Sequence, residues 1–292
     1  MKQNLKKRLA TLCGLMAMAL TAACVAANEQ PAASPSTTPE ETEQASEQAS
    51  EEVTESPPAT VDLSEYPELE LPQLTPVKAG EEIAVMETSM GTIKMRFFPE
   101  YAPKAVENFI TRAKEGYYNE TIFHRVIDEF MIQGGDPRGD GTGGQSMWGE
   151  PFEMEIVPNL HHIRGALAMA RSQAEVSQGS QFYIVQNKKL DESSAEMLQS
   201  FLEGQDHVAA EDEEGKPIPI AQLFPQKMVD QYLEIGGVPS LDYNYTVFGQ
   251  VIEGMDVVDK IAAVETSQDE KKLDKPLEDI VIQNITFESY TA

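Results

Sequence analysis

The chain has 292 residues, among which 49 Asp and Glu outnumber 22 Lys and Arg and leave a formal net charge of −27. Binding to phosphate requires clustered basic residues, so this composition argues against a nucleic-acid-binding protein. A surface this acidic also repels anionic lipid, so charge alone would not hold the protein at a membrane.

The first 23 residues have the layout of an export signal. Lys2, Lys6, Lys7 and Arg8 precede an uncharged apolar run over residues 9–23. Secretory signals have this order of a basic start and a short apolar region. The run is shorter than the roughly 20 residues that span a bilayer. We therefore expect residues 1–23 to be a cleaved signal peptide.

A cysteine follows this run directly. Small residues before Cys24 resemble the lipobox of bacterial lipoproteins, although Thr21 stands where a leucine is usual. The resemblance implies a lipoprotein whose Cys24 carries lipid such as palmitate, and two acyl chains anchor a protein firmly. The predicted location is the extracytoplasmic face of the cell membrane. An ordinary cleavage site with an incidental cysteine is the alternative. Cys13 lies in the removed segment, so no disulfide is expected.

Residues 24–80 are expected to form a disordered acidic linker. Pro, Ser, Thr, Glu, Gln and Ala dominate this segment. Apolar residues are too sparse to offset the entropy of ordering, and prolines with like charges favour an extended chain. We interpret the segment as a stalk between the membrane and a domain at residues 81–292.

The domain at 81–292 has the pattern of a mainly β protein. Eight strands are expected at residues 83–86, 92–98, 122–126, 130–133, 166–170, 182–186, 246–251 and 280–287. One helix should begin at Pro103, where proline is tolerated, and a second should cover residues 255–263. This set of eight strands and two helices predicts a closed antiparallel eight-stranded barrel capped by two α-helices.

A polar segment at about residues 187–237 interrupts this rhythm. It contains an acidic run at 211–214, and residues 193–202 and 227–235 have the pattern of short helices. A separate domain of about 50 residues without disulfides would be marginally stable. We therefore predict a partly helical loop insertion into the barrel, which could cover part of a neighbouring groove.

Four sequence blocks carry the functional information. They are FHRVIDEFMIQGGD at 123–136, GTGG at 141–144, GSQFYI at 179–184 and VFG at 247–249. Together and in this order they resemble the signature blocks of cyclophilins, which are peptidyl-prolyl cis-trans isomerases. The resemblance covers most of residues 81–292 and implies the cyclophilin barrel. It also implies a monomer that acts on proline-containing unfolded or extended polypeptides without a cofactor or metal.

The residues of the first block can also be interpreted without the family. Alternation along a strand would send Phe123 and Arg125 to one face and His124 to the other. Apolar residues beside a few polar groups are typical of a ligand site. The glycines at 141–144 favour turns over a phosphate loop, because no Lys follows at P-loop spacing.

The implied reaction is rotation about an X-Pro amide, which requires no proton transfer. By resemblance Arg125 is the catalytic hydrogen-bond donor, and Gln133 holds the substrate backbone. The resemblance assigns substrate binding to Phe130, Met131, Ala170, Arg171, Ser172, Gln181, Tyr183, Leu241 and Tyr245. We interpret His124 as a hydrogen-bonded structural histidine rather than a base. His161 and His162 resemble half of a metal site but lack further ligands.

Several positions depart from the family pattern. Ser240 occupies the place of a tryptophan, Tyr245 that of a histidine, Arg171 that of an asparagine and Tyr183 that of a phenylalanine. Loss of the indole removes an apolar wall and a donor, so we expect weak cyclosporin binding. The alternative function is a peptide-binding chaperone or adhesion module on the same barrel, with weak or no turnover.

Overall fold

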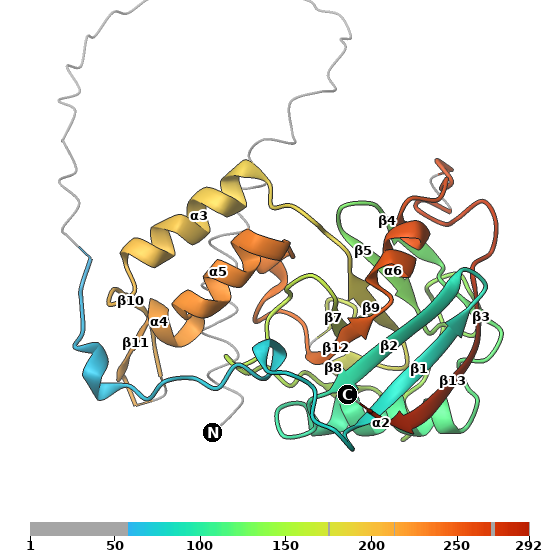
Figure 1. Cartoon of the computed structure of the whole chain (residues 1–292), viewed down its shortest axis with the longest axis horizontal. Coiled ribbons are helices and arrows are strands. Elements are labelled where there is room, and N and C mark those ends of the chain that lie inside the picture. Colours follow the sequence, from blue (N-terminus) through green and yellow to red (C-terminus); the bar gives the residue numbers. More distant parts are fainter. Residues whose placement is uncertain (1–57, 175, 213, 270–271, 292) are drawn as a thin grey trace, which may run out of the picture.

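The computed structural model describes residues 58–174, 176–212, 214–269 and 272–291 (Figure 1). The predicted signal peptide and Cys24 lie outside these residues. Within the described part of the chain, no helix combines the length and apolarity that crossing a membrane would require.

One antiparallel sheet forms the main body, in the strand order β3-β13-β1-β2-β12-β7-β9-β5-β4. Its strands are β1 (Glu82–Thr88), β2 (Gly91–Phe97), β3 (Thr121–Ile122), β4 (Arg125–Ile127), β5 (Met131–Gly134), β7 (Ala166–Met169), β9 (Phe182–Val185), β12 (Val247–Glu253) and β13 (Val281–Ser289). A separate short pair joins β6 (Phe152–Glu153) to β8 (Val176–Gln178). The predicted mainly β antiparallel fold is confirmed.

The strand count and the closure differ from the predicted eight-stranded closed barrel. The strand expected at 122–126 is two strands, β3 and β4, at opposite edges of the curled sheet. Phe123 and His124 connect them, and an isolated bridge joins Ile122 of β3 to Asp136, which follows β5. Phe123 is fully buried in the main core. The chain therefore leaves one edge, buries an aromatic ring and enters the other edge, which a continuous strand could not do.

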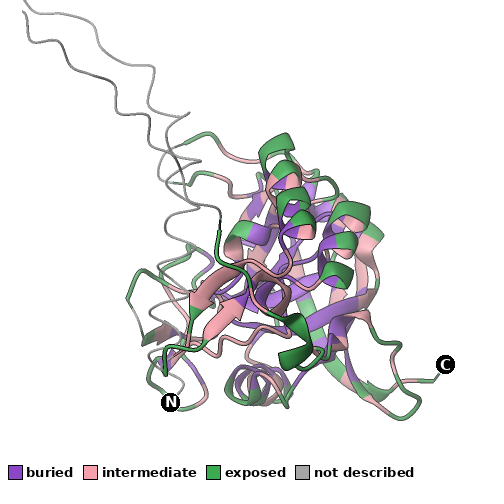
Figure 2. Ribbon diagram, turned by 90° about the vertical axis from the view of Figure 1, so that its left-hand side faces the viewer, coloured by how far each residue is buried: buried purple, intermediate pink, exposed green. Residues whose placement is uncertain are grey.

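The two predicted capping helices are present as α2 (Pro103–Lys114) and α6 (Met255–Ala262). Pro103 occupies the first turn of α2, where its missing N–H costs no hydrogen bond. From this helix, Phe109 packs edge-on against Phe182 of the sheet, with ring centroids 5.3 Å apart. Helices in Figure 2 are exposed on one side and buried on the other, as amphipathic helices on a sheet must be.

The insertion folds beside the barrel, on the left in Figure 1. It contains α3 (Glu192–Glu203), β10 (Val208–Glu211), β11 (Pro217–Pro219), α4 (Ile220–Leu223) and α5 (Gln226–Ile235). The two predicted helices correspond to α3 and α5, whereas the β10–β11 hairpin and α4 were not predicted. Buried residues of the insertion form a second hydrophobic cluster, separate from the main core. This cluster also includes Leu71, Ile163 and Tyr243 from outside the insertion, so the insertion shares its apolar interior with the adjoining chain.

Residues 58–80 differ from the disordered linker that composition predicts. They contain the 3-10 helices η1 (Leu63–Glu65) and η2 (Pro72–Leu74), and Thr60 forms a β-bridge with His207 of the insertion. Leu71 is buried in the insertion's hydrophobic cluster. The packed part of the chain thus includes Thr60, well before the expected domain boundary at residue 81. Composition missed this because a partner far along the chain supplies the apolar surface.

Candidate active site

A pocket of about 110 Å³ opens on the sheet where β4, β5 and β9 lie side by side. Nine residues line it: Arg125, Phe130, Met131, Gln133, Ala170, Arg171, Tyr183, Leu241 and Tyr245. All nine are residues that the sequence assigned to the groove. The remaining two, Ser172 and Gln181, line an adjoining pocket that shares residues with the first. The structure thus gathers every predicted groove residue in one region.

Strand register explains why the polar residues of this pocket share a face. Arg125 of β4 is paired with Gln133 of β5, and Gln133 is paired with Tyr183 of β9. Residues directly opposite one another in antiparallel strands have adjacent side chains on one face. Phe123 does not share this face, because it lies in the core and outside both strands. The predicted alternation across residues 123–125 is therefore wrong.

The guanidinium of Arg125 has one acidic neighbour in the described structure. Its Nε lies 3.5 Å from Oδ2 of Asp274, and 43% of its side chain is exposed. Ion pairs at such exposure contribute about 1 kcal/mol or less. Asp274 therefore orients the guanidinium without neutralising it. Sequence reasoning missed Asp274, which lies in the loop before β13 and carries no local signal of contact with β4.

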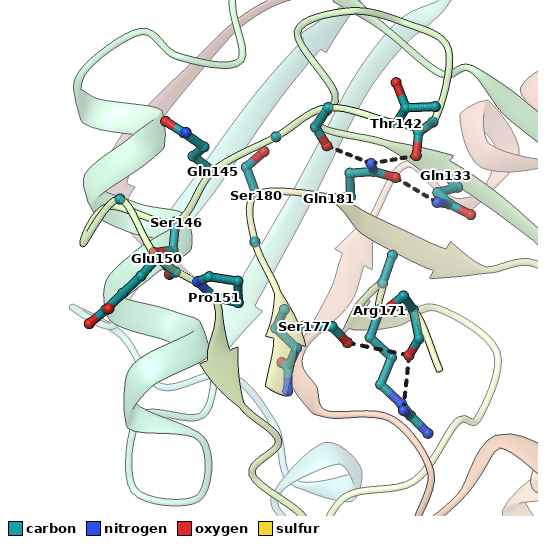
Figure 3. A pocket seen from close by; sticks show the side chains of 18 residues that line it. Gln133, Thr142, Gln145, Ser146, Glu150, Pro151, Arg171, Ser177, Ser180 and Gln181 are labelled. Atoms are coloured by element: carbon teal, nitrogen blue, oxygen red, sulfur yellow. Dashed lines mark hydrogen bonds between the residues drawn. The ribbon is translucent and has the colours of Figure 1, made fainter. Parts of the chain in front are cut away.

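Two glutamines connect the first pocket with the adjoining one (Figure 3). Nε2 of Gln133 donates to Oε1 of Gln181 over 2.9 Å, and Nε2 of Gln181 donates to the carbonyl oxygens of Gly141 and Gly143. These bonds fix both amides at the junction of the pockets. The predicted roles of Gln133 and Gln181 as polar contacts agree with this placement.

The adjoining pocket has a volume of about 480 Å³, and glycine, serine and glutamine residues make up much of its lining. Its wall includes the glycine run at 141–144, in which Gly141 and Gly144 have positive φ angles of 82° and 100°. A side chain at Gly144 would place its Cβ 2.4 Å from Oγ of Ser180. The run therefore forms turns, as predicted. Sequence reasoning missed further lining residues here, including Ser146, Glu150, Pro151 and Ser177.

The departures from the family pattern build one wall of the first pocket. Nε of Arg171 donates to the carbonyl of Asn244 over 2.8 Å, and its guanidinium lies 5.2 Å from the ring centroid of Tyr245. Tyr245 in turn meets Tyr183 edge-on at 5.9 Å. A cation and the phenol ring of Tyr245 thus occupy this wall, next to the ring of Tyr183 on the pocket floor. Ser240 is exposed and does not line the pocket.

His124 differs from the prediction of a hydrogen-bonded histidine. The residue is buried, and neither ring nitrogen has a hydrogen-bond partner among the described residues. Burial lowers the pKa of His124, because a charged imidazole would lose its hydration. The ring therefore fills space as a neutral group behind the strand that carries Arg125.

His161 and His162 face an acid. The Nδ1 atom of each ring lies 2.8 Å from a carboxylate oxygen of Asp242. Burial alone raises the pKa of Asp242, but the charge and hydrogen bonds of the histidines outweigh it and lower the pKa below its usual range. No described residue of the insertion lines the 110 Å³ pocket. The predicted cover of the groove by the insertion is therefore absent among the described residues, and the insertion instead contacts Asp242 through the hydroxyl of Tyr232.

An outward-facing apolar pocket on a curled antiparallel sheet, with an arginine at its rim, defines a peptide-binding enzyme of the cyclophilin type. Residues 83–287 match the family model described as "Cyclophilin type peptidyl-prolyl cis-trans isomerase/CLD". This match covers most of the chain. The chain therefore belongs to the cyclophilin family, and it is a peptidyl-prolyl cis-trans isomerase.

Relatives and solved structures agree with this family. A "Putative peptidyl-prolyl cis-trans isomerase" of Staphylococcus saprophyticus is 41% identical over 223 residues, which are 76% of this chain and 98% of that protein. A protein of the same name from Staphylococcus aureus strain USA300 is 41% identical over 226 residues, 77% of this chain and all of that protein. A crystal structure of a Cryptosporidium parvum cyclophilin in the presence of the dipeptide Ala-Pro matches with a TM-score of 0.51 and 28% identity, over 71% of this chain and 99% of that one.

Proposed function

We propose that Arg125 is the catalytic donor of this isomerase and that substrate proline binds in the 110 Å³ pocket. The observation that carries the proposal is the lining itself, which joins one partly exposed guanidinium to apolar side chains and a fixed glutamine. The reaction needs a surface for the proline ring and a donor at its edge. The pocket offers both.

The chemistry follows from the amide bond. Resonance holds the X-Pro bond planar, with a barrier of about 18–20 kcal/mol. In the twisted form the proline nitrogen regains its lone pair and accepts a hydrogen bond. A donor that binds this form better than either planar form lowers the barrier. Shortening a lifetime of tens of seconds to milliseconds requires roughly 10⁴-fold, or about 5–6 kcal/mol. One charged donor in a sheltered site supplies about half of this.

The remaining gain comes from holding the chain on both sides of the rotating bond. Phe130, Met131 and Leu241 offer the proline ring an apolar floor. Gln133, held by Gln181, is placed to bind substrate backbone at the junction of the two pockets. Positioning of this kind converts binding energy into a lower barrier.

Replacement of Arg125 tests the proposed roles. We expect Arg125→Ala to lower kcat/KM for a proline tetrapeptide about 100-fold, since it removes the donor. Arg138→Ala is the matched control, because Arg138 is an exposed arginine outside the lining of both pockets. NMR exchange spectroscopy or a protease-coupled assay measures the rate. A rate unaffected by Arg125→Ala would show that the catalytic role is wrong.

We further propose that the isomerase is an exported lipoprotein that assists the folding of exported proteins at the cell surface. The basic start, the short apolar run and Cys24 support this location, and the acidic segment that follows suits a stalk. Fractionation of cells and mass spectrometry of the mature N-terminus test it. We expect the wild type in the membrane fraction with acyl chains on residue 24. Cys24→Ala should leave the protein unacylated, and an unmodified wild-type cysteine would contradict the proposal.

A second candidate function is peptide binding with little turnover, as in a chaperone or adhesion module. The replacement of family residues by Tyr245 and Arg171 favours it, because both side chains line the pocket. Ser240 lies outside the lining and leaves the pocket without the indole of the family pattern. An aggregation assay on an unfolded client protein, with wild type and Arg125→Ala compared, separates the two functions. A chaperone would keep its holding activity in this variant, whereas an isomerase that acts by turnover would lose its effect on refolding rates. Cyclosporin binding should be weak in either case.

A further inference from the structure

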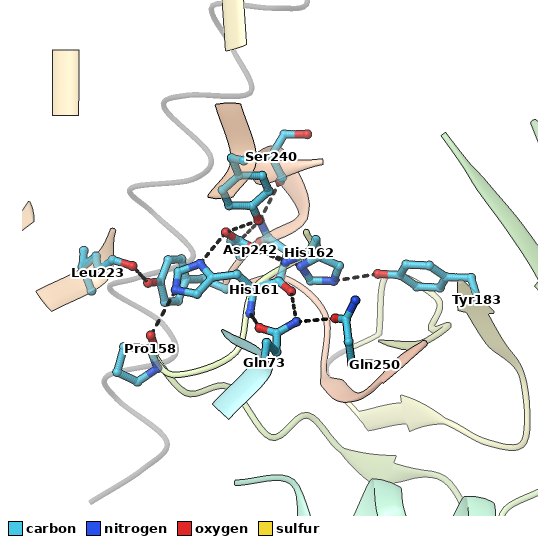
Figure 4. Close-up of polar contacts among 12 residues, drawn as sticks. Gln73, Pro158, His161, His162, Tyr183, Leu223, Ser240, Asp242 and Gln250 are labelled. Atoms are coloured by element: carbon cyan, nitrogen blue, oxygen red, sulfur yellow. Dashed lines mark hydrogen bonds and ion pairs between the residues drawn. The ribbon is translucent and has the colours of Figure 1, made fainter. Parts of the chain in front are cut away.

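A continuous chain of buried hydrogen bonds connects the insertion to the pocket floor (Figure 4). The hydroxyl of Tyr232, on α5, donates to Oδ2 of Asp242 over 2.8 Å. Oδ1 of Asp242 lies 2.8 Å from Nδ1 of His162, and Nε2 of His162 lies 2.9 Å from the hydroxyl oxygen of Tyr183. All four side chains are buried. The last of them lines the 110 Å³ pocket.

The partners of His161 determine the charge of this cluster. Its Nδ1 lies 2.8 Å from Oδ2 of Asp242, and its Nε2 lies 3.1 Å from the carbonyl oxygen of Pro158. A carboxylate and a carbonyl can only accept hydrogen bonds. Both ring nitrogens must therefore carry protons, which makes His161 an imidazolium that neutralises Asp242. A buried acid requires such a compensating charge.

The same reasoning gives the direction of the remaining bonds. With Asp242 already neutralised by His161, a second buried cation would be uncompensated, so His162 is neutral. Its Nδ1–H and its backbone N–H, at 2.8 and 2.7 Å, donate to Oδ1 of Asp242. Its Nε2 must then accept the proton of the Tyr183 hydroxyl. The hydroxyl of Tyr183 is thus directed away from the groove and held by a partner with a single orientation.

The rings beside Tyr183 complete its fixation. The imidazole of His162 and the phenol ring of Tyr183 are nearly parallel, at 14°, with centroids 6.0 Å apart. Tyr245 meets the same ring edge-on. A phenylalanine, which stands here in the family pattern, would have no hydroxyl to reach His162. The connection therefore depends on the tyrosine of this chain.

We propose that Tyr183, His162 and Asp242 form a positioning relay through which helix α5 of the insertion sets the pocket floor. The relay fixes the depth and tilt of the Tyr183 ring and so determines how tightly a proline ring binds. It performs no proton transfer and contacts no reacting atom. The proposal rests on the proposed use of this pocket for proline. It predicts effects on KM and on peptide Kd, with kcat little changed.

Two substitutions of His162 separate its two bonds. In His162→Asn the amide takes the place of Nδ1, so it retains a donor for Asp242 but no longer reaches Tyr183. In His162→Gln the amide takes the place of Nε2 and reaches Tyr183. We expect Tyr183→Phe and His162→Asn each to raise KM and Kd about 3–10-fold, the range of one buried hydrogen bond. The double variant should show no further increase, and His162→Gln should recover most of the affinity.

Tyr118→Phe is the matched control for stability. It also removes a fully buried hydroxyl, which donates to the carbonyl of Ser180 over 3.1 Å in the main core. Each variant is compared at a temperature where it is fully folded, with a fluorescent Ala-Pro peptide as the probe for Kd. Tyr232→Phe tests the arm that reaches the insertion and should raise Kd about two- to threefold.

The outcomes separate the relay from a purely structural cluster. The relay is overturned if His162→Asn lowers the melting temperature while Kd and KM keep their wild-type values, or if the two single effects multiply in the double variant. A wild-type Kd in Tyr232→Phe would show that the insertion does not influence peptide binding through the relay. Since Kd is measured without turnover, a failure of Arg125→Ala to slow catalysis would refute the proposed catalytic role and leave this test intact.

Discussion

The groove and the buried cluster at Asp242 use charge in opposite ways. In the groove, 43% of the Arg125 side chain is exposed, and its acidic neighbour is 3.5 Å away. In the cluster, the Asp242 side chain is 1% exposed and accepts hydrogen bonds of 2.7–2.8 Å from two histidines and a tyrosine. A charge that must meet a substrate keeps its access to solvent, whereas a charge that holds elements together is enclosed and neutralised. Removal of the charge in the groove should therefore affect turnover, whereas removal of the charge in the cluster should affect stability in addition to any change in peptide affinity that the cluster transmits.

The strongest test of this contrast is Asp242→Asn. It leaves the imidazolium of His161 buried without its counter-ion, and breaking a buried pair in this way costs about 3–5 kcal/mol of the free energy of unfolding. Urea denaturation followed by circular dichroism measures the loss. Asp256→Asn is the control, because that exposed acid pairs with Lys260 one helical turn away and should change stability by about 0.5 kcal/mol or less. Equal losses in the two variants would contradict the contrast.

The segment at residues 58–80 offers a second test of buried contacts that affect stability. Leu71 is buried against the insertion, so Leu71→Ala should lower the free energy of unfolding by about 2–4 kcal/mol. Leu63, an exposed leucine of the same segment, provides the control, and Leu63→Ala should stay within about 0.5 kcal/mol of the wild type. Thermal unfolding measures both. If Leu71→Ala behaves like its control, the segment contributes nothing to the folded domain.

A third test concerns pH and the neutral histidine behind the groove. The pKa of His124 in the folded chain is lowered below its ordinary value of 6.5 by burial. As the pH falls through 6.5, the unfolded chain therefore binds a proton at this site before the folded chain does, and the free energy of unfolding decreases. Above pH 6.5 this contribution is constant.

The substitution His124→Leu should flatten the slope of stability against pH below 6.5. Phe123→Leu is the control, because it changes the neighbouring buried ring without removing a titratable group, and its slope should equal that of the wild type. Urea midpoints between pH 5 and pH 8 measure the slopes. A slope that persists in His124→Leu would assign the titration to another group.

The smallest effect is expected at Asp274, the acid beside Arg125. Asp274→Asn removes the charge that orients Arg125, so kcat/KM should fall, by about fivefold or less, because a half-exposed ion pair is weak. Asp279→Asn is the control, since this exposed acid pairs with Lys275 instead. The tetrapeptide assay measures both variants. A loss of kcat/KM approaching that of Arg125→Ala would contradict the weak orienting role assigned to Asp274.

By itself, the sequence determined the fold class, the two capping helices, two helices of the insertion and the set of groove residues. Periodicity specified the strands and helices, whereas the groove residues followed from the resemblance of the sequence blocks to the cyclophilin pattern. In the structure Arg125 begins β4 and Gln133 lies in β5. The same local patterns predicted a single strand over residues 122–126, where the structure has two strands separated by Phe123 and His124.

Only the tertiary structure decided which distant residues meet. Asp274 reaches Arg125, Leu71 enters the insertion, and Asp242 joins Tyr232 of the insertion to His162 behind the groove. Tyr232 and Asp242 are 10 residues apart, but His162 and Asp242 are 80 apart, and Asp274 and Leu71 are also distant in sequence from the residues that they contact. None of these contacts has a pattern that appears within a single segment. The physical reason is that a side chain is buried or paired by whatever surface the folded chain brings to it, and composition and periodicity describe only its immediate neighbours.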